Sequence, residues 1–130
     1  MTHPPPSTPP SLRPSGIFIK SDESEGSLRV TLSGNGDASA VQPLDDYLVQ
    51  LHGQLAQSKA SAVLIDVTQL VFMNSSCIKA FASWIHDVKV SASPYMIRLR
   101  LNPGLLWQKR TLKTLTRLAP SVVQLEEVSL

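Results

Sequence analysis

The fold is decided by residues 64–81, which read LIDVTQLVFMNSSCIKAF. Residues 62–67 form an almost unbroken apolar run rich in β-branched side chains, which is typical of a central strand covered on both faces. Asn74, Ser75 and Ser76 are good N-cap residues, so we expect a helix to begin at Asn74 or Ser75. One apolar face of that helix recurs at a spacing of three and four residues, at Ile78, Phe81, Ile85 and Val88.

The first turn of this helix is a favourable place for a negative charge. Unpaired backbone N–H groups and the helix dipole put about half a positive charge there. A phosphate on Ser75 or Ser76 would therefore be stabilised by the helix that follows it.

The same segment resembles the signature of STAS domains of the anti-sigma-factor antagonist type. In that family a strand leads to Phe-Met-Asp-Ser-Ser-Gly and a hydrophobic helix, and here the motif stands as Phe72-Met73-Asn74-Ser75-Ser76-Cys77. A looser likeness lies upstream, where Leu32-Ser33-Gly34-Asn35-Gly36-Asp37 matches a strand followed by Gly-Glu-Leu-Asp and a helix. The likeness covers about residues 16–130.

The resemblance implies a regulatory domain that binds a protein and is not an enzyme. Ser75 matches the phosphoacceptor, because it directly follows the position of the family's aspartate. The implied partners are an anti-sigma factor that is also a serine kinase and a metal-dependent serine phosphatase. The unphosphorylated domain would capture the anti-sigma factor and release sigma. No catalytic residue, cofactor or metal is expected in the domain itself.

Two residues depart from the family motif and leave an alternative open. Asn74 keeps the ability to cap a helix but lacks the carboxylate that could orient or polarise the serine hydroxyl. Cys77 replaces a glycine, and its side chain would restrict the backbone and crowd a partner that packs on this turn. The alternative is a phosphorylation-independent STAS scaffold module in a signalling or transport assembly.

The rest of the chain alternates strand and helix patterns. Alternating apolar residues predict strands around residues 28–32 and 97–101, with a shorter strand at 17–20 and a last one at 122–125. Helices are expected after Pro43 and Pro103, with apolar stripes at Leu44, Leu48, Leu51 and Leu55 and at Leu105, Leu112, Leu115 and Leu118. The order β-β-α-β-α-β-α-β predicts an α/β domain, a small mixed sheet with helices packed on it.

Length and composition favour one cytoplasmic domain with a tail. The chain has 130 residues and one cysteine, which excludes an internal disulfide, and no apolar run approaches the ~18 residues of a membrane span. The first 15 residues hold six of the ten prolines and almost no large apolar side chain. We expect them to form a disordered, partly polyproline-II tail, and residues 16–130 to form the domain.

Two aspartates are further candidate neighbours of the serines. Asp37 and Asp66 each stand where a predicted strand ends, at the edge from which the loops emerge. Either carboxylate could cap a loop by hydrogen bonding or shape a surface for a partner. Trp84 lies at the margin of its helix face and is predicted to be core, with an exposed anchor as the alternative.

Other polar residues indicate little chemistry. His52 and His86 belong to separate helices with no second ligand at metal spacing, so we expect solvated or partly buried side chains. Cys77 has no identifiable base beside it, which predicts a packed or weakly reactive thiol. Glu126 and Glu127 point to opposite faces of a strand and are interpreted as solvating charges.

Basic residues concentrate near the C-terminus. Residues 98–117 hold six of the twelve basic residues and no acid, and Lys109, Lys113 and Arg117 recur on one helix face. A solvated face is the simplest explanation, and an acidic protein partner is the next. Nucleic acid or anionic lipid is less favoured, because the net charge is only +2 and no array of stacking aromatics accompanies the cations.

Overall fold

The computed structural model describes residues 16–24, 27–58 and 60–128. Within these ranges five strands form one sheet, in the spatial order β1-β2-β3-β4-β5. Their bounds are Ile17–Ser24 (β1), Ser27–Gly36 (β2), Ala62–Met73 (β3), Met96–Leu101 (β4) and Val123–Glu127 (β5). β1 pairs antiparallel with β2, and the other neighbours pair in parallel. The predicted mixed sheet is confirmed, while the expected tail lies outside the described residues.

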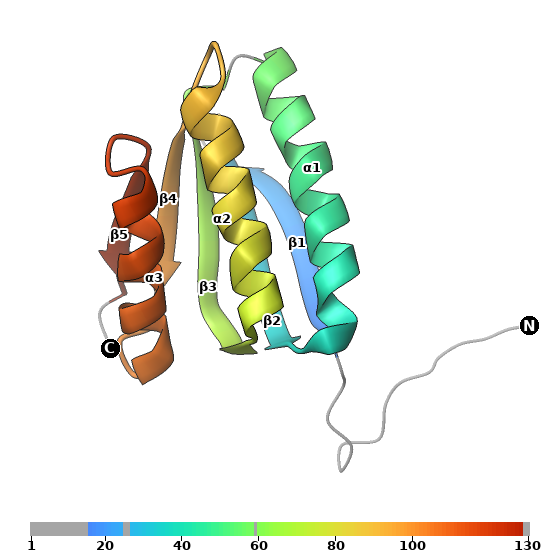
Figure 1. Cartoon of the computed structure of the whole chain (residues 1–130), viewed down its shortest axis with the longest axis vertical. Coiled ribbons are helices and arrows are strands. Elements are labelled where there is room, and N and C mark those ends of the chain that lie inside the picture. Colours follow the sequence, from blue (N-terminus) through green and yellow to red (C-terminus); the bar gives the residue numbers. More distant parts are fainter. Residues whose placement is uncertain (1–15, 25–26, 59, 129–130) are drawn as a thin grey trace, which may run out of the picture.

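The three α-helices of the described residues lie on one face of the sheet (Figure 1). They are α1 (Val41–Ser58), which follows the short 3₁₀ helix η1 (Ala38–Ala40), α2 (Ser75–Val90) and α3 (Leu106–Leu118). From β2 to β5 each new strand is added on the same side of the last. Because crossovers between parallel strands are right-handed, every connecting helix must then pack on the same face.

The opposite face of the sheet is polar. β3 is the central strand of the sheet, as predicted, but the expectation that both of its faces are covered is wrong. Asp66 and Arg100 are paired in register on β3 and β4, and Arg100 is paired with Glu126 on β5. The strand run is apolar in sequence because Val63, Ile65 and Val67 face the helices, while Leu64 and Asp66 alternate with them on the uncovered face.

The helices present apolar stripes to the sheet much as their spacing predicts. Phe81, Trp84, Ile85 and Val88 of α2 are buried, which confirms the core assignment of Trp84. In α3 the stripe is shifted, because Leu118 is 44% exposed and Leu105 precedes the helix, whereas Gln108 is completely buried. The predicted core positions of this helix are therefore confirmed for Leu112 and Leu115 and are wrong for Leu105 and Leu118.

β3 extends six residues beyond residues 62–67, the apolar run from which it was predicted. β2 stays paired with it as far as Met73 through two irregularities in register, whereas β4 leaves it after Asp66. Side chains near the start of α3 replace β4 as partners of the carbonyl groups. Gln108 Nε2 donates to the carbonyls of Val67 (2.6 Å) and Leu70 (2.9 Å), and Trp107 Nε1 donates to that of Val71 (2.7 Å).

Candidate functional site

The serine turn, residues 74–77, joins the end of β3 to the start of α2. Asn74 is the N-cap: its backbone is extended, and its Oδ1 accepts a hydrogen bond from the Cys77 N–H at 2.9 Å. The helix therefore begins at Ser75, and Ser75 and Ser76 are both exposed in its first turn. Asparagine performs the capping here without a carboxylate.

The serine turn is fixed against the end of β2. The Asn74 N–H donates to the carbonyl of Gly36 at 2.7 Å. A Cβ on Gly36 would lie 3.0 Å from both the Met73 Cα and the Phe72 carbonyl oxygen, so the close approach of the two strands requires glycine. Sequence reasoning did not single out Gly36, although a glycine at a strand end beside a functional turn was the available signal.

Cys77 belongs to the core and not to the surface of the turn. Its side chain has no exposed area, and its Sγ lies 3.9 Å from the Asp37 carbonyl oxygen. The expected crowding of a partner by this residue is therefore wrong. Burial raises the pKa of the Cys77 thiol, and the negative charge of Asp37 raises it further. These influences favour a packed, weakly reactive thiol.

Asp37 lies beside the serine turn, but its carboxylate is engaged elsewhere. One oxygen accepts hydrogen bonds from the Ser39 N–H (3.0 Å) and Ser39 Oγ (2.6 Å), and the other accepts from the Gly16 N–H (3.1 Å). The Ser39 hydroxyl, followed by the Gly16 N–H, lowers the pKa of the Asp37 carboxyl below its usual value. Asp37 thus caps η1 and ties the start of β1 to the end of β2.

Asp66 lies away from the serine turn, so the expectation that it ends a strand beside the loops is wrong. It stands within β3, seven residues before Met73, or about 20 Å along the strand. Its Oδ1 accepts from the Thr68 N–H (2.9 Å) and Thr68 Oγ1 (2.6 Å), and its Oδ2 lies 3.4 Å from Arg29 Nη2. Thr68 and Gln69, which follow Asp66, lie at an irregularity inside a longer strand and not at its end.

Exposed apolar side chains lie near the serine turn, and sequence reasoning missed them. Val71 and Phe72 at the end of β3 are 50% and 49% exposed, and Leu106 at the start of α3 is 85% exposed. β3 ends at the same edge of the sheet at which α2 and α3 begin (Figure 1). The signal available was an apolar run that continued through Phe72 after the core positions of the strand were filled.

A buried polar cluster joins α1, α2 and the segment before β4. The Tyr95 hydroxyl lies 2.8 Å from His52 Nδ1 and accepts a hydrogen bond from Trp84 Nε1 at 3.0 Å. Burial raises the pKa of Tyr95 to about 12, so its hydroxyl stays protonated at neutral pH. This cluster satisfies polar atoms inside the core.

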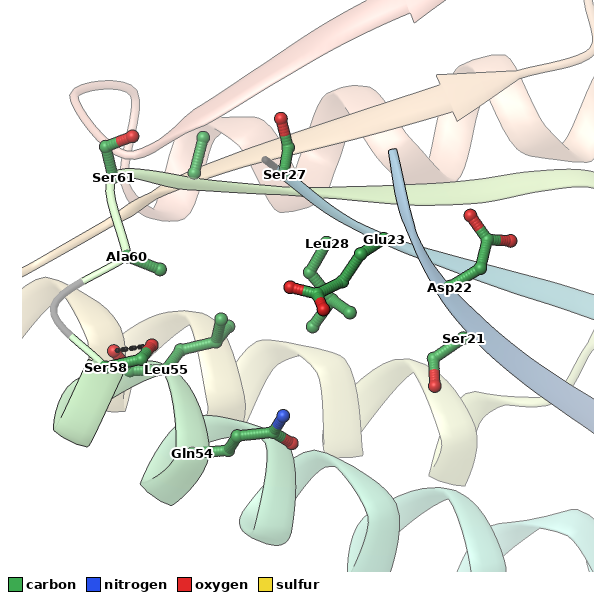
Figure 2. Close-up of a pocket in the computed structure, with 11 residues that line it drawn as sticks. Ser21, Asp22, Glu23, Ser27, Leu28, Gln54, Leu55, Ser58, Ala60 and Ser61 are labelled. Carbon is green, nitrogen blue, oxygen red and sulfur yellow. Dashed lines mark hydrogen bonds between the residues drawn. The ribbon is translucent and has the colours of Figure 1, made fainter. Parts of the chain in front are cut away.

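A polar cleft lies at the start of β3, at the opposite end of this strand from the serine turn. It has a volume of about 520 Å³ and lies between the β1–β2 strands, the end of α1 and the start of β3. Figure 2 shows Ser21 and Glu23 reaching from β1 toward Gln54 on α1. The cleft is far from Ser75 and shares no residue with the serine turn.

The described residues offer no group of three histidine, cysteine, aspartate or glutamate side chains that could hold a metal ion. None of the helices in this part of the chain is long and apolar enough to cross a membrane.

Comparison with known proteins identifies the fold. No protein-family model and no curated protein sequence matches the chain. An anti-sigma factor antagonist from Mycobacterium paratuberculosis matches with a TM-score of 0.57 and 19% identity, over 78% of this chain and 80% of that one. The anti-sigma factor antagonist SpoIIAA in its unphosphorylated form matches with a TM-score of 0.56 and 13% identity, over 86% and 89%.

The phosphorylated form of SpoIIAA, a Bacillus cell fate determinant, gives the same result. It matches with a TM-score of 0.57 and 14% identity, over 86% of this chain and 92% of that one. These identities establish the fold alone. The chain therefore has the STAS-like fold of anti-sigma factor antagonists, a single small α/β domain with a five-stranded mixed sheet.

Proposed function

We propose that this protein is a non-enzymatic, cytoplasmic antagonist of an anti-sigma factor, switched by phosphorylation of Ser75. The observation that carries the proposal is the place of Ser75. It is the exposed first residue of α2 in a fold that SpoIIAA adopts in both a phosphorylated and an unphosphorylated form. The proposed partners are an anti-sigma factor with serine kinase activity and a serine phosphatase.

The switch would act on the partner surface and leave the fold intact. A phosphate adds about 1.5 to 2 negative charges, which repel acidic groups of a partner and resist desolvation at an interface. The N-terminus of α2 favours that charge, and the Asn74 cap is independent of the Ser75 hydroxyl. We expect the phosphorylated domain to remain folded while it loses the anti-sigma factor.

A second candidate is a phosphorylation-independent scaffold module in a signalling or transport assembly. It is favoured by Asn74, because the residue before the acceptor offers no carboxylate to orient or polarise the hydroxyl. The side-chain oxygen of Asn74 is already used to cap the Cys77 N–H, so it is directed at the backbone.

Phosphopeptide mapping after incubation with ATP and the anti-sigma factor kinase separates the two functions. We expect label on Ser75, persistence of that label in Ser76→Ala and its loss in Ser75→Ala. Asn74→Asp tests whether the missing carboxylate slows the reaction, and we expect faster modification. A kinase that binds the domain but labels Ser75 in neither wild type nor Asn74→Asp would favour the scaffold.

Pull-down of the same anti-sigma factor measures the consequence for binding. Ser75→Ala should bind constitutively in the presence of ATP, and Ser75→Asp should bind less well although one carboxylate imitates a phosphate only in part. Binding by the phosphorylated protein and by Ser75→Asp that is as strong as binding by the unphosphorylated protein would contradict the switch.

A further inference from the structure

The outward face of α3 carries a row of cations that begins with an exposed leucine. Leu106, Arg110, Lys113 and Arg117 follow one another at a spacing of three and four residues, so they share one side of the helix. All four are exposed, and Leu106 is 85% exposed. We call these four residues, with the neighbouring Lys109, the α3 surface.

The positive charge of the α3 surface is not balanced by acidic residues of α3 itself. α3 contains four basic residues and no acidic residue. Lys109 lies 3.7 Å from Glu127, with both side chains about half exposed. Within the described ranges no carboxylate lies at ion-pair distance from Arg110, Lys113 or Arg117. Like charges three and four residues apart destabilise a helix, so stability of α3 does not explain this row.

The apolar end of the α3 surface lies near the serine turn. Leu106 precedes Trp107, whose indole Nε1 donates to the Val71 carbonyl at 2.7 Å. Val71 and Phe72 are half exposed and lead into Asn74. The Trp107–Val71 hydrogen bond therefore joins the end of β3, with its exposed apolar side chains, to the first turn of α3, and the cations extend from there along the helix.

We propose that the α3 surface binds an acidic, amphipathic helical segment of a protein partner. From Leu106 to Arg117 the row spans about 16 Å at 1.5 Å per residue, which is three turns of a facing helix. Glutamates at a spacing of three and four residues would lie along the cations, and one apolar side chain would contact Leu106. This proposal does not require phosphorylation of Ser75.

The composition of the α3 surface favours a protein over other anionic partners. The Trp107 ring packs against the core and its N–H is used by Val71, so it offers no platform for stacked bases. Leu106 would have no counterpart on a phosphate backbone. Binding to a lipid surface needs a broad apolar face along the helix, whereas Leu106 is the one apolar member of the α3 surface and Val71 and Phe72 belong to β3.

A nuclear magnetic resonance titration of the ¹⁵N-labelled full chain tests the proposal. The probe is a synthetic helical peptide with leucines on one face and glutamates flanking them, and the matched peptide carries glutamine for every glutamate. We expect the acidic peptide to shift resonances of residues 105–118 and of Val71 and Phe72, and the glutamine peptide to bind at least about tenfold more weakly. Raising the salt concentration should weaken the acidic complex.

Variants distinguish this surface from general attraction to a basic protein. Arg110→Glu with Lys113→Glu should weaken the acidic peptide by about tenfold or more, and Leu106→Ser should weaken it without changing its salt dependence. Lys20→Glu, an exposed reversal on β1, is the matched control and should bind as wild type. The thermal melt of each variant verifies that it is folded.

The proposal would be overturned if the acidic peptide did not bind, or if the glutamine peptide bound as tightly. It would also be overturned if the resonance shifts lay outside α3 and the end of β3, or if Lys20→Glu weakened the acidic peptide as much as Arg110→Glu with Lys113→Glu. Tighter binding of a 20-nucleotide single-stranded RNA, or of phosphatidylserine vesicles, would assign the surface to another class of partner and would also overturn it. Because none of these measurements involves a kinase, their outcome is independent of the Ser75 switch.

Discussion

The two faces of the sheet are stabilised by different interactions, although they are made from the same strands. The face under the helices is an apolar core, and one buried polar side chain in it, Gln108, donates hydrogen bonds to the backbone of β3. The uncovered face carries charged side chains that pair across strands, with Arg29 beside Asp66 and with Arg98 and Arg100 on Glu126. Because the helices of the described residues all pack on one face of the sheet, the other face is exposed to solvent, which favours polar side chains there.

This comparison predicts that the largest loss of stability comes from the core. Phe81 is 2% exposed and packs edge-on against Trp84, with ring centroids 6.3 Å apart. Phe81→Ala should lower the free energy of unfolding by about 3 to 5 kcal/mol, because it removes buried area and leaves a cavity. Denaturant unfolding measures the loss, with the exposed Lys79→Ala on the same helix as the control. A stable Phe81→Ala protein would show that this helix face is not the core anchor.

Gln108→Ala should cause the next largest effect and lower the free energy of unfolding by about 2 to 3 kcal/mol, because buried backbone groups would lose their hydrogen-bond partners. Its amide nitrogen serves two β3 carbonyls, and its Oε1 accepts from the Asn102 N–H at 2.8 Å. Faster hydrogen exchange of the Asn102 amide would locate the damage at this bridge. A loss no larger than that of the exposed neighbour Lys109→Ala would mean that water replaces the side chain.

Asp66 tests whether the uncovered face contributes through charge or through local hydrogen bonds. Asp66→Ala should destabilise by about 1.5 to 3 kcal/mol, since it removes the acceptor for Thr68 and the partner of Arg29. Asp66→Asn keeps an acceptor for the Thr68 groups and should recover more than half of that loss. If asparagine is as damaging as alanine in urea unfolding, the Arg29 ion pair and not the Thr68 contacts holds this part of the strand.

The element order of the fold could be predicted because each element carries its own periodic signal. Residues 62–67 indicated a strand, and the stripe through Phe81, Ile85 and Val88 indicated the helix after it. The uncovered sheet face could not be seen in the same way. A run such as Val63 to Val67 contains too few polar residues to reveal that Leu64 and Asp66 alternate onto an open side.

The candidate site was predictable only where the interaction was local. Asn74 was expected to cap because the residue type and its place before Ser75 suffice for that contact. Asp66 was misplaced because the continuation of β3 beyond it depends on pairing with β2, which is distant in sequence. Gln108 was missed because its partners are in β3, although a glutamine four and seven residues before buried leucines was a visible signal.

The smallest effect concerns Glu126, which was interpreted as a solvating charge and is instead a bridge. Its two oxygens accept from Arg98 Nη2 at 2.5 Å and from Arg100 Nε at 2.8 Å. Partial burial acts to raise the pKa of the Glu126 carboxyl, but the hydrogen bonds from Arg100 and Arg98 outweigh it and lower the pKa. Since the three side chains are partly exposed, Glu126→Gln should destabilise by only about 0.5 to 1 kcal/mol at neutral pH.

The pH dependence of that difference identifies its origin. A carboxyl whose pKa is lower in the folded state contributes stability above its unfolded pKa, near 4.5, and loses the contribution as pH falls through the folded value. The gap in stability between wild type and Glu126→Gln should therefore be constant above about pH 5.5 and shrink below pH 4.5. Glu127→Gln is the control, because Glu127 faces Lys109 on the helix side at 3.7 Å and should change stability less. A gap that persists at pH 3 would show that Glu126 acts through packing, and the uncovered face would then resemble the core more than its charges suggest.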